Sequence, residues 1–206
     1  RHDEASHSFD PENRLLWRAH RRRLDPEALR DAMLSSAGTL DLMPMDSTVW
    51  YLGDQATAVG DNKNRRRTDF FCRTVYLPVI RNDLPELLDV FDFADPHTTT
   101  GMRPQTMVAT QGLFILNDDL VMSAAAASAR RLLAREETGG PEAVVNRMFE
   151  LIINAHPTAE ERSEVLAFVI EMRKRLIAEG HSDANLRAWS MACHALFASS
   201  RFQILE

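Results

Sequence analysis

The spacing of apolar residues predicts a chain built mainly of α-helices. After residue 84, apolar side chains recur every three or four positions, which is the period of an amphipathic helix. Helix-start signals support this pattern: Asp25 precedes Pro26, and Thr158 with Glu161 forms a capping box. The predicted helices cover residues 26–37, 84–91, 103–117, 119–137, 141–155, 159–179 and a last stretch from 184. We therefore expect an all-α fold of six to seven packed helices.

Three segments depart from the helical pattern. Residues 1–12 form a polar lead-in, and 39–72 form a long irregular loop with several glycines and a run of arginines. Residues 73–79 alternate polar and apolar side chains, which predicts one short strand or extended segment. We expect residues 13–206 to form a single helical domain, truncated at its N-terminal side. The alanine run at 124–127 indicates either a central helix that packs closely or plain helix propensity.

The predicted helix at 103–117 carries a polar stripe on an otherwise apolar surface. Such a helix is expected to be largely buried, and each unpaired buried polar group would cost about 1–3 kcal/mol. Two carboxylates lie just upstream, and we expect Arg103 to pair with one of them. We call this predicted arrangement the polar clasp. Its members are Asp92, Asp95, Arg103, Thr106, Thr110, Gln111 and Asn117.

The acidic turn before this helix also allows a functional interpretation. Asp92, Asp95 and His97 provide oxygen and nitrogen groups that could act in acid–base catalysis or hold a metal. The competing interpretation is an ordinary Asp-Pro turn whose carboxylates accept hydrogen bonds from nearby backbone N–H groups. The turn is favoured, because short motifs of this kind match by chance. We assign no metal site and no cofactor site.

Composition narrows the classes of function further. The 206 residues carry a formal net charge of −6, which argues against a dedicated nucleic-acid-binding protein. No apolar run is long enough to insert across a membrane. The two cysteines, Cys72 and Cys193, are either one disulfide or two buried thiols, and no CxxCH haem-attachment motif is present.

Six sequence blocks, in order, resemble a known bacterial family. They are NRLLWRAHRRRLDPEALRDAML, RTVYLPVIRN, FDFADP, RPQTMVATQGLFILN, HPTAEE and AWSMACHALFASSRFQILE. They are similar to the planctomycete-type domain of unknown function called PSD-one, which accompanies planctomycete cytochrome C domains. The resemblance implies a periplasmic, cell-envelope or secreted location and a multidomain parent. It assigns no catalytic residues, and any haem would belong to a neighbouring domain.

Three functional hypotheses follow from the residues and the resemblance together. The first is a non-catalytic interaction or scaffold module that binds other domains of its parent protein. The second is an enzyme domain acting on polysaccharide through the carboxylates of Asp92 and Asp95. The third is a docking partner for a c-type cytochrome domain. This hypothesis depends only on the domains that accompany the resembled family.

Overall fold

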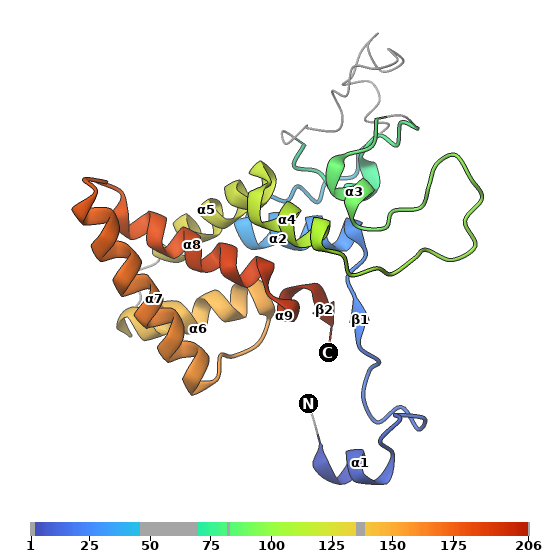
Figure 1. The fold of residues 1–206 in the computed structure, drawn as a ribbon, viewed down its shortest axis with the longest axis horizontal. Helices are drawn as coiled ribbons and strands as arrows, with labels where there is room; N and C mark the ends of the chain where they lie inside the picture. The colour runs from blue at the N-terminus through green and yellow to red at the C-terminus, as the bar shows by residue number, and fades with distance from the viewer. Residues whose placement is uncertain (1–2, 46–69, 82, 135–138, 206) are drawn as a thin grey trace.

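The computed structural model describes residues 3–45, 70–81, 83–134 and 139–205, and it confirms a mainly helical fold (Figure 1). The described part contains six α-helices of nine or more residues, three shorter α-helices, one 3-10 helix and one two-stranded sheet. The long helices are α2 (Pro26–Ala37), α4 (Ala109–Asn117), α5 (Asp119–Leu133), α6 (Gly140–Ile153), α7 (Ala159–Ala178) and α8 (Ala184–Ala198). The short elements are α1 (Glu4–Phe9), β1 (Arg22–Arg23), the 3-10 helix η2 (Thr74–Tyr76), α3 (Glu86–Val90), α9 (Ser200–Gln203) and β2 (Ile204–Leu205).

The core is centred on the packing of α5 against α8. Small side chains line this contact: Ala125 and Ala129 of α5 and Ala188 of α8 are completely buried. Helix α2 packs on α5, and α7 packs on both α6 and α8. The alanine run therefore does mark a central helix, because side chains of this size allow two helix backbones to approach closely.

The sequence signals at several helix ends are confirmed. Thr158 Oγ1 accepts a hydrogen bond from the Glu161 N–H at 3.1 Å, and the Glu161 carboxylate accepts one from the Thr158 N–H at 2.8 Å. Helix α2 begins at Pro26 and is followed by Gly38, whose φ of 74° is the left-handed conformation that glycine adopts without strain. These local rules place helix boundaries without any knowledge of the tertiary structure.

Three predictions of local structure are corrected. Residues 74–76 form a 3-10 helix rather than a strand, and nearby Cys72 makes one isolated parallel bridge with Asp41. The predicted lead-in contains α1, whose N-terminus is capped by the Asp3 carboxylate. The helix expected at 103–117 begins only at Ala109. Of the predicted loop at 39–72, residues 46–69 lie outside the described part of the chain.

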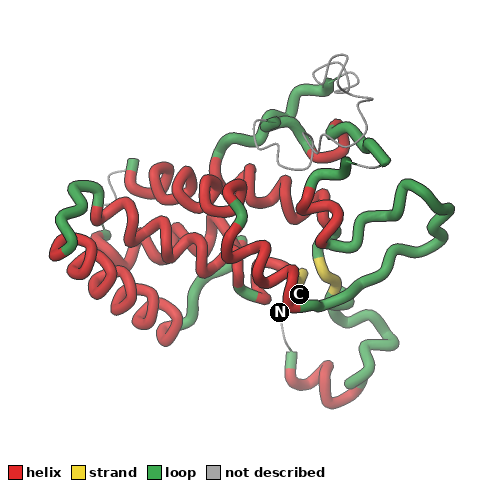
Figure 2. Tube along the Cα trace, turned by 45° about the horizontal axis from the view of Figure 1, so that its top comes forward, coloured by secondary structure: helices red, strands yellow, loops and turns green. Residues whose placement is uncertain are grey.

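The small sheet pairs a segment near the start of the chain, β1, with β2 at the end of the described chain. Arg22 pairs with Leu205 and Arg23 with Ile204 in an antiparallel register. Before β1, residues 3–20 form an arm that projects away from the helical body in both Figure 1 and Figure 2. A second projection, the loop at residues 94–107, leaves the body after α3 and returns to the start of α4.

A second, smaller apolar cluster lies beside α2 and is organised by a buried arginine. Phe70, Cys72 and Leu77 form the cluster. The guanidinium group of Arg30 donates hydrogen bonds to the carbonyl oxygens of Phe70 and Cys72 and to Thr74 Oγ1. Cys72 and Cys193 are both buried free thiols, so of the two alternatives, one disulfide or two buried thiols, the second is confirmed.

Candidate functional site

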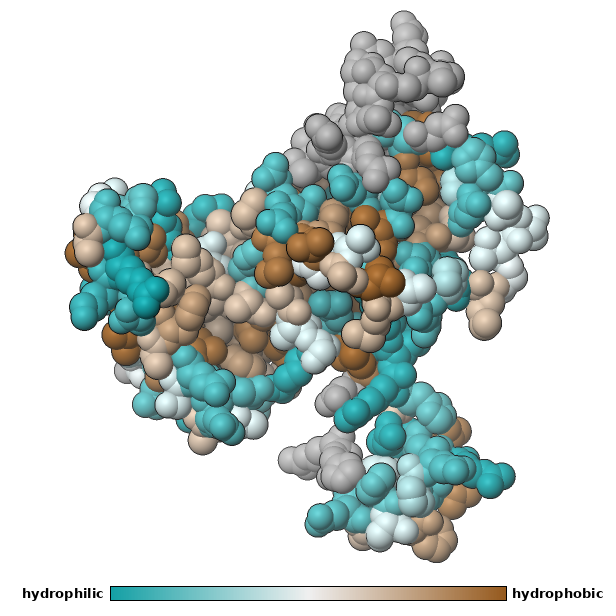
Figure 3. Space-filling model, in the orientation of Figure 1, coloured by the Kyte–Doolittle hydropathy of each residue, from teal (hydrophilic) through white to brown (hydrophobic). Residues whose placement is uncertain are grey.

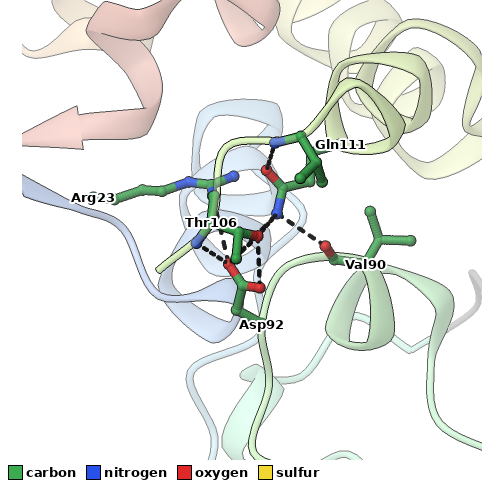
Figure 4. Close-up of polar contacts among 6 residues, drawn as sticks. Arg23, Val90, Asp92, Thr106 and Gln111 are labelled. Atoms are coloured by element: carbon green, nitrogen blue, oxygen red, sulfur yellow. Dashed lines mark hydrogen bonds and ion pairs between the residues drawn. The ribbon is translucent and has the colours of Figure 1, made fainter. Parts of the chain in front are cut away.

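Asp92 directly follows Phe91, the C-cap residue of α3, and has a left-handed conformation with φ of 63°. Aspartate tolerates this conformation better than most residues because its short polar side chain can bond locally. Its carboxylate accepts hydrogen bonds from the Thr106 N–H at 2.8 Å and from Thr106 Oγ1 at 2.8 Å (Figure 4). The turn after α3 is thereby joined to the long loop that leads into α4.

Gln111 extends this network into the protein interior. Its side chain is only 4% exposed, and its Nε2 donates to the Val90 carbonyl oxygen at 3.0 Å and to Thr106 Oγ1 at 3.2 Å. Its Oε1 accepts from the Val108 N–H at 3.2 Å. The last bond satisfies a backbone donor at the start of α4, so it also explains why the helix begins here.

Arg23 supplies the positive charge that the sequence interpretation assigned to Arg103. Its guanidinium group lies 3.7 Å from the Asp92 carboxylate, 5.1 Å from the centre of the Phe91 ring, and donates to the Thr106 carbonyl oxygen. Burial lowers the pKa of Arg23, and the nearby Asp92 charge opposes that shift. Because Arg23 belongs to β1, these contacts connect the two-stranded sheet to the turn after α3 and to the loop that leads into α4.

Arg103 binds a different acid from the one predicted. Its guanidinium group donates to the Glu27 carboxylate at 2.8 Å and lies 4.8 Å from the centre of the Phe93 ring. The hydrogen bond to Glu27 raises the pKa of Arg103, so the arginine remains charged. The expected pairing of Arg103 with Asp92 or Asp95 is wrong, and no local sequence signal identifies a partner on α2.

The other predicted members lie apart from this network. Asp95 forms a local turn, in which its carboxylate accepts from the His97 N–H at 2.8 Å. The His97 ring bonds to the Arg81 carbonyl oxygen at 3.1 Å. Thr110 is exposed, and Asn117 donates to the Leu113 carbonyl oxygen at 2.8 Å within its own helix. The structure therefore brings together Asp92, Thr106 and Gln111, and adds Arg23 to them.

A small pocket lies beside the clasp. Its lining includes Arg23, Pro26, Asp92, Arg103 and Gln105. Its cavity volume of about 10 Å³ is on the order of the space that one water molecule needs. Among the residues that the structure describes, no three His, Cys, Asp or Glu side chains are grouped in a way that could hold a metal ion. The geometry is that of a structural connection between chain segments.

The outer face of α4 is the most unusual feature near the clasp. Its inner face buries Gln111, Phe114 and Ile115. The opposite face presents a stripe of four apolar or small residues, all exposed, which we call the α4 outer face: Ala109, Gly112, Leu113 and Leu116. Figure 3 shows strongly hydrophobic residues gathered over this helix, on the side that faces the viewer.

The comparisons with known proteins identify a family. A family model described as PSD1, protein of unknown function (DUF1553), matches residues 1–169, which is most of the chain. The chain belongs to this family, as the sequence blocks indicated. No curated protein and no solved structure matched in the corresponding searches. Within the described residues, every helix is too short or too polar to cross a bilayer.

Proposed function

We propose that this chain is a non-catalytic helical interaction module of an exported multidomain protein, and that it binds through the α4 outer face. The supporting observation is that Leu113 is 59% exposed and Leu116 is 54% exposed on a helix whose opposite face is already packed into the core. A helix that is apolar around its circumference is normally buried on all sides. The exposed side of α4 therefore has the character of a surface that a partner covers.

The shape of the stripe also suits a partner helix or strand. A Cβ atom placed on Gly112 would meet no other atom within 4 Å, so the surface at this point is open rather than filled by a neighbouring side chain. Ala109 and Gly112 have a small side chain or none, so the backbone of a partner can approach α4 closely beside the two leucines. Exposed apolar patches rimmed by polar residues mark interaction sites.

The candidate catalytic carboxylates have structural roles that support the non-catalytic proposal. Asp92 accepts bonds from Thr106 and faces Arg23, while Asp95 holds its own turn. Glycoside hydrolysis requires two carboxyl groups on opposite sides of a sugar-sized cleft. Asp92 and Asp95 lie in two successive turns only three positions apart in the chain, and the pocket beside Asp92, of about 10 Å³, has no room for a sugar ring.

Side-chain footprinting by hydroxyl radicals tests this proposal. The oxidation of Leu113 and Leu116 would be compared between the isolated chain and its full-length parent protein. We expect both leucines to be protected in the parent, because another domain or copy covers them. Leu42, which is 70% exposed far from α4 in sequence, is the matched control and should be oxidised equally in both. Equal oxidation of all three leucines in the two proteins would refute the proposal.

A further inference from the structure

The segment that leads into α4, residues 103–108, is extended where it meets the clasp. All of its residues are described; they form no helix or turn, and none has a positive φ. The Thr106 N–H donates to the Asp92 carboxylate at 2.8 Å, and the Thr106 carbonyl oxygen accepts from Arg23. Asp92 and Arg23 lie 3.7 Å apart, so both backbone groups of Thr106 point to the same side (Figure 4). The N–H and C=O of one residue point the same way in a strand, whereas they point in opposite directions in a helix.

Backbone hydrogen bonds alternate along this segment. The N–H of Thr106 is bonded to the clasp carboxylate and that of Val108 to a glutamine side chain at 3.2 Å, whereas Pro104 has no N–H group. Among the described residues, none bonds to the N–H or the carbonyl oxygen of Gln105 or Met107. Successive residues of an extended chain direct these groups to opposite edges. Gln105 and Met107 therefore present free donors and acceptors on the edge that faces away from the clasp.

The outer edge of this segment is held in place before any partner arrives. Arg103 donates to the Glu27 carboxylate at 2.8 Å at one end of the segment. The side chain of Gln111, which is 4% exposed, bonds to Thr106 Oγ1 and to the Val108 N–H near the other end. A binding segment that is already ordered loses less conformational entropy when it binds. The edge is thus preorganised for pairing.

The chemistry of the edge identifies the kind of partner that fits it. A row of alternating N–H and C=O groups is matched by another extended polypeptide, which offers the same groups at the same spacing. Residues 104–108 carry no charged side chain, so a charged partner strand would gain no ion pair from them. Met107 is 77% exposed, and a methionine in such a position favours an aromatic or β-branched side chain opposite it. The fitting partner is therefore an uncharged extended segment that contains such residues.

We propose that the outer edge of residues 104–108 binds an extended, uncharged segment of a partner protein by strand addition. Gln105 and Met107 each exchange two backbone hydrogen bonds with the residue opposite, which gives about four bonds in all. The edge is separate from the α4 outer face, because it uses backbone groups that lie before the helix begins at Ala109. This binding site therefore goes beyond the proposed function, and either can fail while the other holds.

A pool of synthetic heptapeptides built from threonine, valine and tyrosine is the probe for this site. Peptides that bind the chain are identified by mass spectrometry, and their affinities are measured by fluorescence anisotropy. We expect dissociation constants below about 1 mM, as a few backbone hydrogen bonds with one apolar contact allow. Amide hydrogen exchange, followed by NMR, should slow by about tenfold or more at Gln105 and Met107 when peptide saturates the chain. The Thr106 amide already has an acceptor, so its exchange should change little.

Methylation of the peptide nitrogens tests whether the peptide binds as a strand. Methyl groups on alternate nitrogens along the pairing edge should abolish binding, because they remove the donors that the chain requires. Methyl groups on the nitrogens of the other edge should leave binding intact. A peptide that binds through its side chains alone would lose affinity equally in both cases.

Substitutions at Met107 test the edge from the side of the chain. Met107→Pro removes a backbone donor and should weaken the best peptide by about tenfold or more, since proline blocks pairing at a strand edge. Met107→Leu keeps the donor and should bind the peptide nearly as well as the unsubstituted chain. Met102→Pro is the matched control, because Met102 is 88% exposed in the same loop but lies outside the edge, and peptide binding should be unchanged. Slow exchange of the Thr106 amide in all three variants shows that the clasp is intact.

Several results would overturn the proposal. They are a pool in which no peptide protects the Gln105 and Met107 amides, equal binding by Met107→Pro, and an equal effect of methylation on the two peptide edges. Protection of those amides without peptide, growing with the concentration of the chain, would also overturn it, because a second copy would then occupy the edge.

Discussion

Replacing Arg30 by methionine should open the small apolar cluster beside α2 while leaving the main core closed. Arg30 is 4% exposed, and its guanidinium group is the donor for the carbonyl oxygens of Phe70 and Cys72. Methionine keeps much of the aliphatic length of the side chain but has no donor. The change therefore removes the hydrogen bonds without leaving a large cavity.

The size of the effect follows from the acceptors that lose their donor. Each buried carbonyl left unpaired costs about 1–3 kcal/mol, and removing one member of a buried charged network costs roughly 3–5 kcal/mol. The segment around Cys72 can detach and regain hydrogen bonds from water, which limits the loss to the free energy of local opening. We expect that opening to become easier by about 3 kcal/mol, which corresponds to roughly a hundredfold larger open population.

The two free thiols report local and global opening separately. Cys72 belongs to the small cluster, whereas Cys193 is fully buried in the main core, where burial raises its pKa to about 12. In Arg30→Met, the reaction of Cys72 with an aromatic disulfide reagent at neutral pH should accelerate by about a hundredfold. Cys193 should react at its original rate. Peptide mass spectrometry after labelling assigns each rate to its thiol.

Arg73→Met is the matched control for the loss of an arginine. The Arg73 side chain is 53% exposed and lies 3.6 Å from the Asp31 carboxylate, so this exposed pair contributes little to stability. In Arg73→Met, Cys72 should react with the reagent at the same rate as in the unsubstituted protein. Two results would refute the reasoning: an unchanged Cys72 rate in Arg30→Met, or an equal acceleration of both thiols, which would mean that Arg30 stabilises the whole fold.

Substitutions at three further positions test the clasp and the helix ends by chemical unfolding. Asp92→Ala should lower the free energy of unfolding by about 2–4 kcal/mol, because it removes the bonds to Thr106 and places alanine at a positive φ. Asp92→Asn should lower it by about half as much, and equal losses in the two variants would contradict this account. Thr158→Ala should cost about 1 kcal/mol by removing the capping bond to Glu161, and an unchanged midpoint would contradict it. Burial raises the pKa of Asp118, so its contribution to stability is present at low pH and lost as the pH rises through its folded-state pKa. Asp118→Asn should therefore stabilise the protein at neutral pH but not at pH values below the ordinary aspartate pKa, and a loss of stability at neutral pH would count against this reasoning.

Local sequence signals predicted the helices well where those signals act within one turn of the chain. The capping box at Thr158 and Glu161 and the Asp-Pro start of α2 depend only on neighbouring residues. The short strand or extended segment predicted at 73–79 became a 3-10 helix at residues 74–76, because a tertiary contact decides the conformation there. Asp31 on α2 accepts bonds from both the N–H and the hydroxyl of Thr74, at 2.8 and 2.6 Å. Alternating polarity cannot report a partner that lies more than forty residues away.

The clasp shows the same limit at the level of side-chain partners. The structure places Asp92 beside Thr106 and Gln111, and all three lie within one stretch of twenty residues that the sequence had grouped together. The sequence interpretation missed Arg23 and Glu27, whose contacts with Thr106 and Arg103 join residues 83 and 76 positions apart. Polar residues within an apolar pattern indicate that hydrogen-bond partners are required, but only the tertiary fold determines which residues those partners are.

The error in the length of α4 leads to a more general point about interaction surfaces. Apolar residues around most of the predicted helix indicated that it should be largely buried. The structure buries Phe114 and Ile115 but exposes Leu113 and Leu116. The spacing of apolar residues indicates how much of a helix surface is buried in the functional protein. It does not indicate whether the surface that buries it belongs to the same chain. An apolar face that its own fold leaves uncovered is thus the kind of surface that a partner covers.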